Sequence, residues 1–376
     1  MHDKRIYRTH FAGLLQVELQ QLNGYTVMVK HGTTAVLITG SLVAKQPEQV
    51  VITANFDDQL LLNLLKTTLL TTLHLTQPLM LQVISWGTRT REALTPLLFL
   101  GASLVIQQML PNAPVFVAVN TTYDGHQWRI GRKQCNNLLM VGNNAGIILL
   151  ESNGSITQKR NVLLSGIRQT YQIMLSLAAF VTQITYEMGH YSEKKNTSIT
   201  SEHHFITRRP LLSYEQHLLP TTGSSLWISG DTQVIASVEQ HSQQLVMAAN
   251  HSYQLSLWTN FINNIFVPLQ LMNKLSTITI NDDGSLLTAN VYADLLALAD
   301  AGVQIAWPIY AQTLALCKHQ IIAMPNAADE CQAHALFNVA GYDQNLLSLR
   351  ITTNHYSLPL TTVHEVLTNI DTTSCL

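Results

Sequence analysis

The stretch 86-WGTRTREALT-95 contains residue types that can hold an anion. It follows an apolar, strand-like run and precedes a helix-like one, which is the order of parts in a phosphate-holding turn. Arginine and threonine side chains donate hydrogen bonds to phosphate or carboxylate, and glycine lets a backbone approach a ligand closely. The predicted anion-binding residues are Gly87, Thr88, Arg89, Thr90 and Arg91. The alternative is that this loop only connects two buried elements.

The next helix is expected to begin at Pro96 with Thr95 as its N-cap, because proline suits the first turn of a helix and disrupts its interior. Six further basic residues could add to the same surface: Arg129, Arg132, Lys133, Lys159, Arg160 and Arg168. The chain contains neither G-x-x-x-x-G-K-[ST] nor G-x-G-x-x-G. No nucleotide fingerprint therefore supports the anion hypothesis, and the sequence indicates no particular cofactor.

Searches for metal sites and nucleophiles find little. Four histidines have the right chemistry for zinc but not the H-E-x-x-H spacing, so we expect a polar loop and no metal: His190, His203, His204 and His217. The chain has no G-x-S-x-G elbow. Asp282 and Asp283 follow a strand-like run and could act on a ligand, but an Asp-Gly turn explains them as well.

The charge composition is unusual. Only 12% of the residues are charged, where about 25% is typical, and such a weakly charged surface favours a homo-oligomer or a protein complex. Residues 1–224 hold 18 Lys and Arg against 12 Asp and Glu, whereas residues 225–376 hold 3 against 11. This change of sign indicates a compositional boundary. The acidic second part and the absence of a known module argue against nucleic-acid binding.

The expected location is the cytoplasm. The four cysteines have no C-x-x-C spacing, which favours free thiols in a reducing compartment. The N-terminus has no apolar signal segment. The apolar runs at 93–106 and 173–181 are shorter than the roughly 18–20 residues that span a bilayer, so we expect no membrane insertion.

The pattern of elements predicts an α/β fold. Runs 13–21 and 25–31 flank Asn23-Gly24, a strong hairpin signal, and 34–43 extends them into a β-meander. Strand-like and helix-like runs then alternate, which favours βαβ crossovers and a mixed, largely parallel sheet. In the second half we expect helices at 290–301, 309–319, 328–340 and 360–370. No internal sequence repeat is visible.

These observations divide the chain into three parts. Residues 1–188 form a basic α/β domain with an N-terminal β-meander, 189–224 a linker or mobile loop, and 225–376 an acidic α/β domain. The helical run 161–188 is apolar around most of its circumference and is the candidate for a domain spine or an oligomer interface.

Two functions remain open. The first is an α/β enzyme, possibly a transferase, that binds an anionic small molecule in an interdomain cleft. The second is a noncatalytic subunit or assembly factor of a protein complex, which accounts for the low charge and the absence of catalytic motifs. A metal-dependent hydrolase is a third, weaker possibility.

Overall fold

The computed structural model of the chain describes residues 5–11, 14–20, 25–44, 47–73, 75–88, 90–130, 136–154, 158–187, 204–207, 212–239, 246–248, 261–266, 274–305, 308–318, 320–354 and 357–370. The chain forms two compact units. The first comprises residues 1–150, 165–198 and 354–360, and the second comprises residues 151–164, 199–353 and 361–376.

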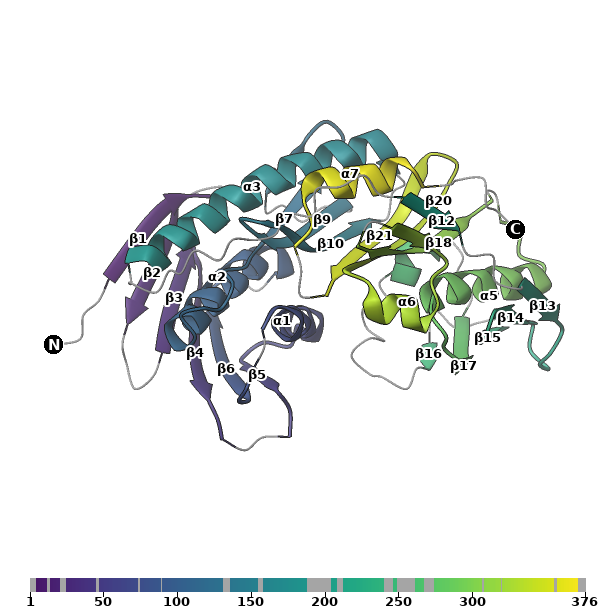
Figure 1. The fold of residues 1–376 in the computed structure, drawn as a ribbon, viewed down its shortest axis with the longest axis horizontal. Helices are drawn as coiled ribbons and strands as arrows, with labels where there is room; N and C mark the ends of the chain where they lie inside the picture. The colour runs from purple at the N-terminus through teal and green to yellow at the C-terminus, as the bar shows by residue number, and fades with distance from the viewer. Residues whose placement is uncertain are drawn as a thin grey trace. The chain divides into compact units, whose positions relative to one another are not determined.

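The first unit begins with a six-stranded sheet in the order β1-β2-β3-β4-β6-β5 (Figure 1). Its strands are β1 (Arg5–His10), β2 (Leu14–Gln20), β3 (Tyr25–His31), β4 (Thr34–Leu42), β5 (Val50–Ala54) and β6 (Leu79–Trp86). Strands β1 to β4 form an antiparallel meander, as predicted. Strand β5 is parallel to β6, and α1 (Gln59–Thr72) connects them. The predicted turn Asn23-Gly24 lies outside the described residues.

Helix α2 (Arg91–Met109) lies between two layers of the first unit. It packs against β3 and β4 on one side and against β7 (Val117–Tyr123) on the other. Residues 94–107 are therefore all buried. Among the described residues, α2 is the one helix long and apolar enough to cross a membrane, but 78% of that window is buried within the protein.

The rest of the first unit builds on β7. This strand pairs with β8 (Trp128–Ile130) and β9 (Asn136–Asn143), and β10 (Gly146–Gly154) lies next to β9. Helix α3 (Arg160–Glu187) has a buried face, and its Gly166 leaves room for the indole of Trp128, which a β-carbon would meet at 2.2 Å.

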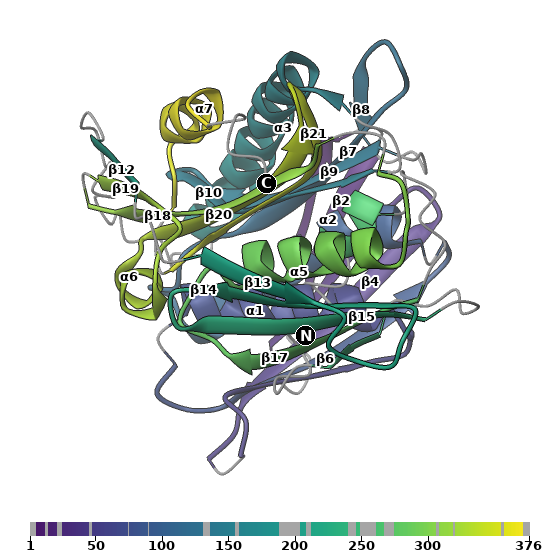
Figure 2. The same ribbon diagram turned by 90° about the vertical axis from the view of Figure 1, so that its right-hand side faces the viewer.

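The second unit contains a five-stranded sheet, which we call sheet C, in the order β13-β14-β15-β17-β16. Its strands are β13 (Leu212–Gln216), β14 (Gly223–Ser229), β15 (Thr232–Glu239), β16 (Val246–Ala248) and β17 (Lys274–Asn281). Helix α5 (Leu286–Asp300) lies along one face of sheet C (Figure 2) and also contacts β18 (Tyr310–Cys317).

The second layer of this unit has the strand order β12-β19-β18-β20-β21. Its other strands are β12 (His204–Thr207), β19 (Gln320–Ala323), β20 (Ala335–Tyr342) and β21 (Asn345–Thr353), with β11 (Gln158–Lys159) paired to β21. Helices α6 (Ala327–Gln332) and α7 (Leu360–Thr368) complete the described elements.

The two units repeat one topology. In the first, the meander β2-β3-β4 is followed by a parallel pair β5 and β6, a buried helix α2, and the strands β7, β9 and β10. In the second, the meander β13-β14-β15 is followed by a parallel pair β16 and β17, the buried helix α5, and the strands β18, β20 and β21. The structure thus contains a repeat that the sequence did not reveal.

Several predictions about the fold need correction. Mixed α/β content is present, but the largely parallel sheet is not confirmed, because only β5–β6, β12–β19 and β16–β17 are parallel among the described pairs given above. Helix α2 begins at Arg91 and contains Pro96, so the predicted start at Pro96 was wrong. Residues 310–317 and 335–342 are strands, where helices were expected.

Helix α3 confirms the predicted helical run 161–188, and its role as an oligomer interface remains a prediction. Its buried residues recur every three or four positions, as in Leu163, Ile167 and Met174, whereas Arg168, Gln169 and Gln172 are exposed. The helix is therefore amphipathic, with one face buried in the protein. Within the predicted linker 189–224, β12 and β13 are strands, and residues 189–203 and 208–211 lie outside the described part of the chain. The predicted domain boundaries remain a prediction.

The core of the second unit contains a carboxyl group with a perturbed pKa. Asp294 of α5 is fully buried and accepts a hydrogen bond of 2.9 Å from Thr277 Oγ1 of β17. Burial raises the pKa of Asp294 from 3.8 to about 7, although the Thr277 hydrogen bond opposes this shift. Folding therefore favours the protonated acid.

We predict that the free energy of unfolding falls as the pH rises from about 4 to 7, because the unfolded chain loses this proton first. Asp294 can contribute a slope of at most about 1.4 kcal/mol per pH unit. Asp294→Asn should flatten the slope in urea titrations across this range, while Asp231→Asn, at an exposed position, should not. Equal slopes in the wild type and Asp294→Asn would contradict the assignment.

Candidate functional site

The first unit has a pocket of about 580 Å³ where β5 and β6 end. Because these strands are parallel, their carboxyl ends lie at the same edge, and α1 and α2 both begin there. The pocket is lined by Asn55, Phe56, Asp57, Asp58, Gln59, Leu60 and Arg91. Helix N-termini at such an edge present backbone N–H groups, which is why ligands often bind there.

Asn55 joins the two strand ends. Its Oδ1 accepts a hydrogen bond of 2.8 Å from the backbone N–H of Ser85, and its Nδ2 donates to the Ser85 carbonyl at 3.1 Å. The Asn55 side chain thus pairs with the backbone of Ser85 just beyond the last residue of β5, in the place of a backbone partner. This contact fixes one wall of the pocket.

Asp58 makes two contacts at the start of α1. Its Oδ1 accepts the Leu61 N–H at 3.0 Å, which makes Asp58 the N-cap of the helix. The guanidinium of Arg91 donates from Nη2 to Oδ1 at 2.9 Å and from Nε to Oδ2 at 3.0 Å. This bidentate pair connects the first turns of α1 and α2.

The structure separates the predicted anion-binding residues. Arg91 lines the pocket, whereas Gly87, Thr88 and Thr90 are exposed and do not line it. Arg89 lies outside the described residues.

Gly87 has a structural role that the sequence did not show. Its φ is +84°, and a β-carbon there would lie 2.0 Å from the carbonyl oxygen of Thr33. The close backbone approach is therefore made to the turn between β3 and β4, and it is this contact that requires glycine. Thr90 is the N-cap of α2 but makes no side-chain capping bond.

The charges of the pocket limit its chemistry. Its lining has two carboxylates, Asp57 and Asp58, and the guanidinium of Arg91 is already paired with one of them. An anion would have to compete with Asp58 for Arg91. The sequence did contain a signal for this pair, namely two acids before one helix and an arginine before the next, but it gave no distance between them.

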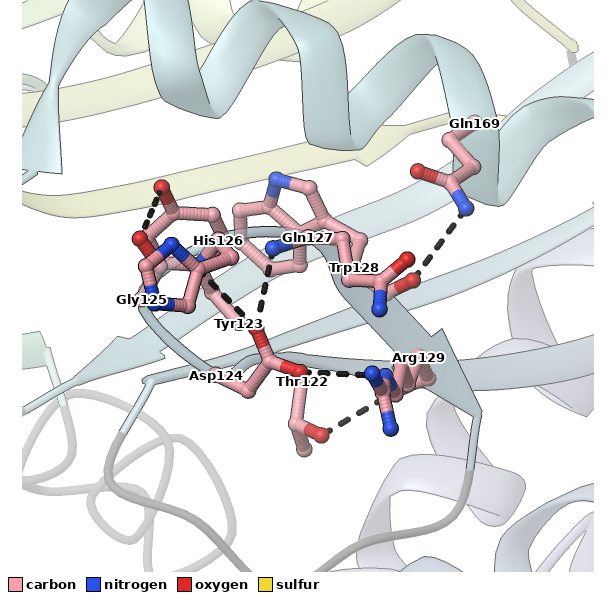
Figure 3. A network of polar contacts seen from close by, with 9 residues as sticks. All are labelled: Thr122, Tyr123, Asp124, Gly125, His126, Gln127, Trp128, Arg129 and Gln169. Carbon is pink, nitrogen blue, oxygen red and sulfur yellow. Dashed lines mark hydrogen bonds and ion pairs between the residues drawn. The ribbon is translucent and has the colours of Figure 1, made fainter.

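Arg129, another base of the predicted surface, is also paired. Figure 3 shows the turn between β7 and β8, where Arg129 Nε contacts Asp124 Oδ2 at 3.0 Å. Asp124 Oδ1 also accepts the N–H groups of Gln127 and His126, and these bonds lower the pKa of Asp124. Asp124-Gly125, a dipeptide typical of tight hairpins, thus joins the antiparallel strands β7 and β8. Arg132 and Lys133 lie outside the described residues.

The acidic turn before α5 has a structural explanation. Asp282 Oδ1 accepts the N–H of Gly284 at 3.0 Å, as expected for an Asx turn. Glu330 of α6 accepts the Ser285 N–H at 2.6 Å, and burial is the main reason that its pKa is raised to about 7. Among the described residues, no group of three or more His, Cys, Asp or Glu side chains could hold a metal ion.

Comparison with known proteins adds little. The chain matches no protein-family profile and no curated protein. Solved structures similar to part of it include the crystal structure of rice (Oryza sativa) Rrp46, with 17% sequence identity and a TM-score of 0.37. That match covers 43% of this chain and 87% of the Rrp46 chain. At this TM-score the likeness supports no conclusion about function.

We predict that Asp58→Ala lowers the free energy of unfolding by about 1–2 kcal/mol, because it removes both the cap and a partly exposed ion pair. Asp58→Asn should cost less, since asparagine also caps helices. The neighbouring exposed Asp57→Ala is the control and should change stability little. Urea denaturation measures all three, and equal effects of Asp58→Ala and Asp57→Ala would show that the Asp58 contacts contribute nothing.

Proposed function

We propose that the protein is a noncatalytic subunit of a protein complex and that its partner binds the face of sheet C opposite α5, which we call the outer face. The observation that carries this proposal is a cluster of aliphatic side chains on that face. Low overall charge is consistent with a surface that another protein covers.

Strand register places these side chains together. Leu226 is opposite Ile235, and Ile235 is opposite Ile278, so one row crosses β14, β15 and β17. The adjacent Ile228 and Ile280 follow at the period of two that keeps side chains on one face. Residues of the alternate set, including Trp227, Val234 and Val238, are buried on the α5 side.

Two residues of the outer face are exposed, and Leu226, Ile228 and Ile235 are partly buried. Ile278 is 50% and Ile280 54% accessible. Single exposed aliphatic residues are common, but a row across three strands is the pattern of a contact surface. Burying apolar area contributes about 25 cal/mol per Å², so these side chains could stabilise a complex.

The corresponding face of the first unit has a similar row. There Glu18 of β2 lies in the row that continues through Met28, Leu37 and Ile84. In the second unit Glu215 of β13 lies opposite Leu226 in the same way. Glu18 accepts hydrogen bonds of 2.8 Å from both Lys30 and Gln16, so the glutamate end of the first row is held in a polar network.

The test is a photo-crosslinking amino acid at position 278, compared with one at the exposed Gln172 of α3. We expect a discrete heterologous adduct from position 278 alone. The partner identified by crosslinking, once purified, should bind the double variant Ile278→Gln/Ile280→Gln at least about tenfold more weakly than it binds the wild-type chain. An absent adduct, or unchanged affinity in the double variant, would overturn the proposal.

The pocket favours a second candidate, an α/β enzyme that binds a phosphate- or carboxylate-bearing molecule through Arg91. For this candidate we propose, as the sequence predicts, that residues 87–91 bind the anion. We likewise propose that this enzyme is a transferase and that its ligand binds in an interdomain cleft. The division of the chain into two domains and the cytoplasmic location are also proposals.

For this candidate, Asp58→Asn should strengthen anion binding, because it releases Arg91 from its ion pair. Arg91→Ala should weaken binding by roughly tenfold or more. Thermal-shift titrations with inorganic phosphate, nucleotides and sugar phosphates would measure both effects. If every anion stabilises wild type, Asp58→Asn and Arg91→Ala equally, Arg91 is structural.

A further inference from the structure

Strand β13 is an end strand of sheet C within the described part of the chain. All five of its residues are exposed, including Leu212 at 51% and Tyr214 at 56%. An end strand presents unpaired backbone groups that can pair with another strand. Proteins commonly protect such an edge with lysine, proline or a bulge. The segment 212-LSYEQ-216 contains neither lysine nor proline. Its pairing with β14 shows no register shift and therefore no bulge.

The hydrogen-bond pattern identifies the backbone groups of β13 that face away from β14. His217 N donates to Ser224 O at 3.2 Å, so residue 217 faces β14. In an antiparallel ladder, backbone groups alternate in direction along the strand. Ser213 and Glu215 therefore face β14, whereas the N–H and C=O groups of Leu212, Tyr214 and Gln216 point outward.

The edge is also held in a defined position. Gln216 Nε2 donates to the Leu296 carbonyl at 3.3 Å, and His217 Nδ1 lies 2.7 Å from Asp300 Oδ1. Both contacts attach the end of β13 to α5. A strand that is already ordered loses little conformational entropy when it pairs.

We propose that β13 pairs antiparallel with β13 of a second copy of this chain, about a two-fold axis at Tyr214. Leu212 of one copy then lies opposite Gln216 of the other, and the two Tyr214 residues lie opposite each other. These are the residues with outward backbone groups, so each pair exchanges both of its N–H···O bonds. A two-fold axis closes the assembly as a dimer.

The side chains fit this register. Glu215 of each copy lies opposite Ser213 of the other, so no like charges meet. A register centred on Glu215 would place two glutamates directly opposite each other, which is destabilising. Charge therefore favours the register centred on Tyr214, in which the two aromatic rings can pack together.

This inference does not depend on the proposed function, because it concerns the edge of sheet C and a second copy, whereas the proposed partner binds the outer face. Ile278→Gln/Ile280→Gln should leave dimerisation unchanged. Tyr214→Pro and Tyr214→Thr should leave crosslinking to the heterologous partner at position 278 unchanged, because Tyr214 lies opposite Trp227, which is on the α5 side of the sheet. The failure of one proposal is thus distinguishable from the failure of the other.

The test is analytical ultracentrifugation of the full chain over the micromolar range. Wild type should dimerise, and Tyr214→Pro should be monomeric. Proline removes the outward N–H of residue 214 but does not remove a hydrogen bond between β13 and β14. Tyr214→Thr is the matched control: it keeps the N–H and should dimerise more weakly than wild type. Circular dichroism would check that each variant folds.

A second pair of variants tests the register and remains informative if Tyr214→Pro does not fold. Ser213→Lys should tighten the dimer, and Ser213→Glu should weaken it, because residue 213 of each copy lies opposite Glu215 of the other. The dimer contains this 213–215 pair twice, so each variant should change the dimer affinity by roughly twofold to thirtyfold. Both effects should diminish at high salt. A monomeric wild type, a dimer that persists in Tyr214→Pro, or equal affinities for the two Ser213 variants would overturn the proposal.

Discussion

The fold depends on burying one helix between two layers of strands in each unit. Helix α2 has no polar face, and its residues 94–107 are covered by β3 and β4 on one side and by β7 on the other. The Ser103 hydroxyl accepts the Phe116 N–H at 3.1 Å, which satisfies a backbone donor at the entry to β7. Helix α5 has the corresponding place in the second unit. The inner faces of both sheets are apolar because they must cover these helices.

Much of the fold could be predicted where the signal was local. The meander, the Asp124-Gly125 turn, α5 and α7 follow from turn chemistry or helical periodicity within a short window. Strand β18 could not be predicted in this way, because 310-YAQTLALC-317 is buried on both faces and has no alternation. A short apolar run of this kind fits a helix or a strand equally well until its neighbours are known. The start of α2 was missed because Pro96 was assumed to lie in the first turn.

The candidate site was harder to predict than the fold, because its contacts join distant residues. The sequence identified Arg91 as a functional candidate but could not show that Asp58, 33 positions earlier, accepts both of its hydrogen bonds. Likewise, Gly87 suggested a backbone approach, but the neighbour is Thr33. The aliphatic outer face of sheet C follows from alternation within β14, β15 and β17. It becomes visible only when the register aligns Leu226, Ile235 and Ile278.

The first unit is not made of one continuous piece of chain, since residues 354–360 belong to it. Leu358 exchanges two backbone hydrogen bonds with Ile147 of β10, at 2.7 and 2.8 Å. A chain growing from the ribosome therefore cannot complete its first unit when residue 150 emerges. Until residue 358 has been synthesised, Ile147 lacks this pair of backbone hydrogen bonds, so the first unit is completed only after strands β12 to β21 have been translated.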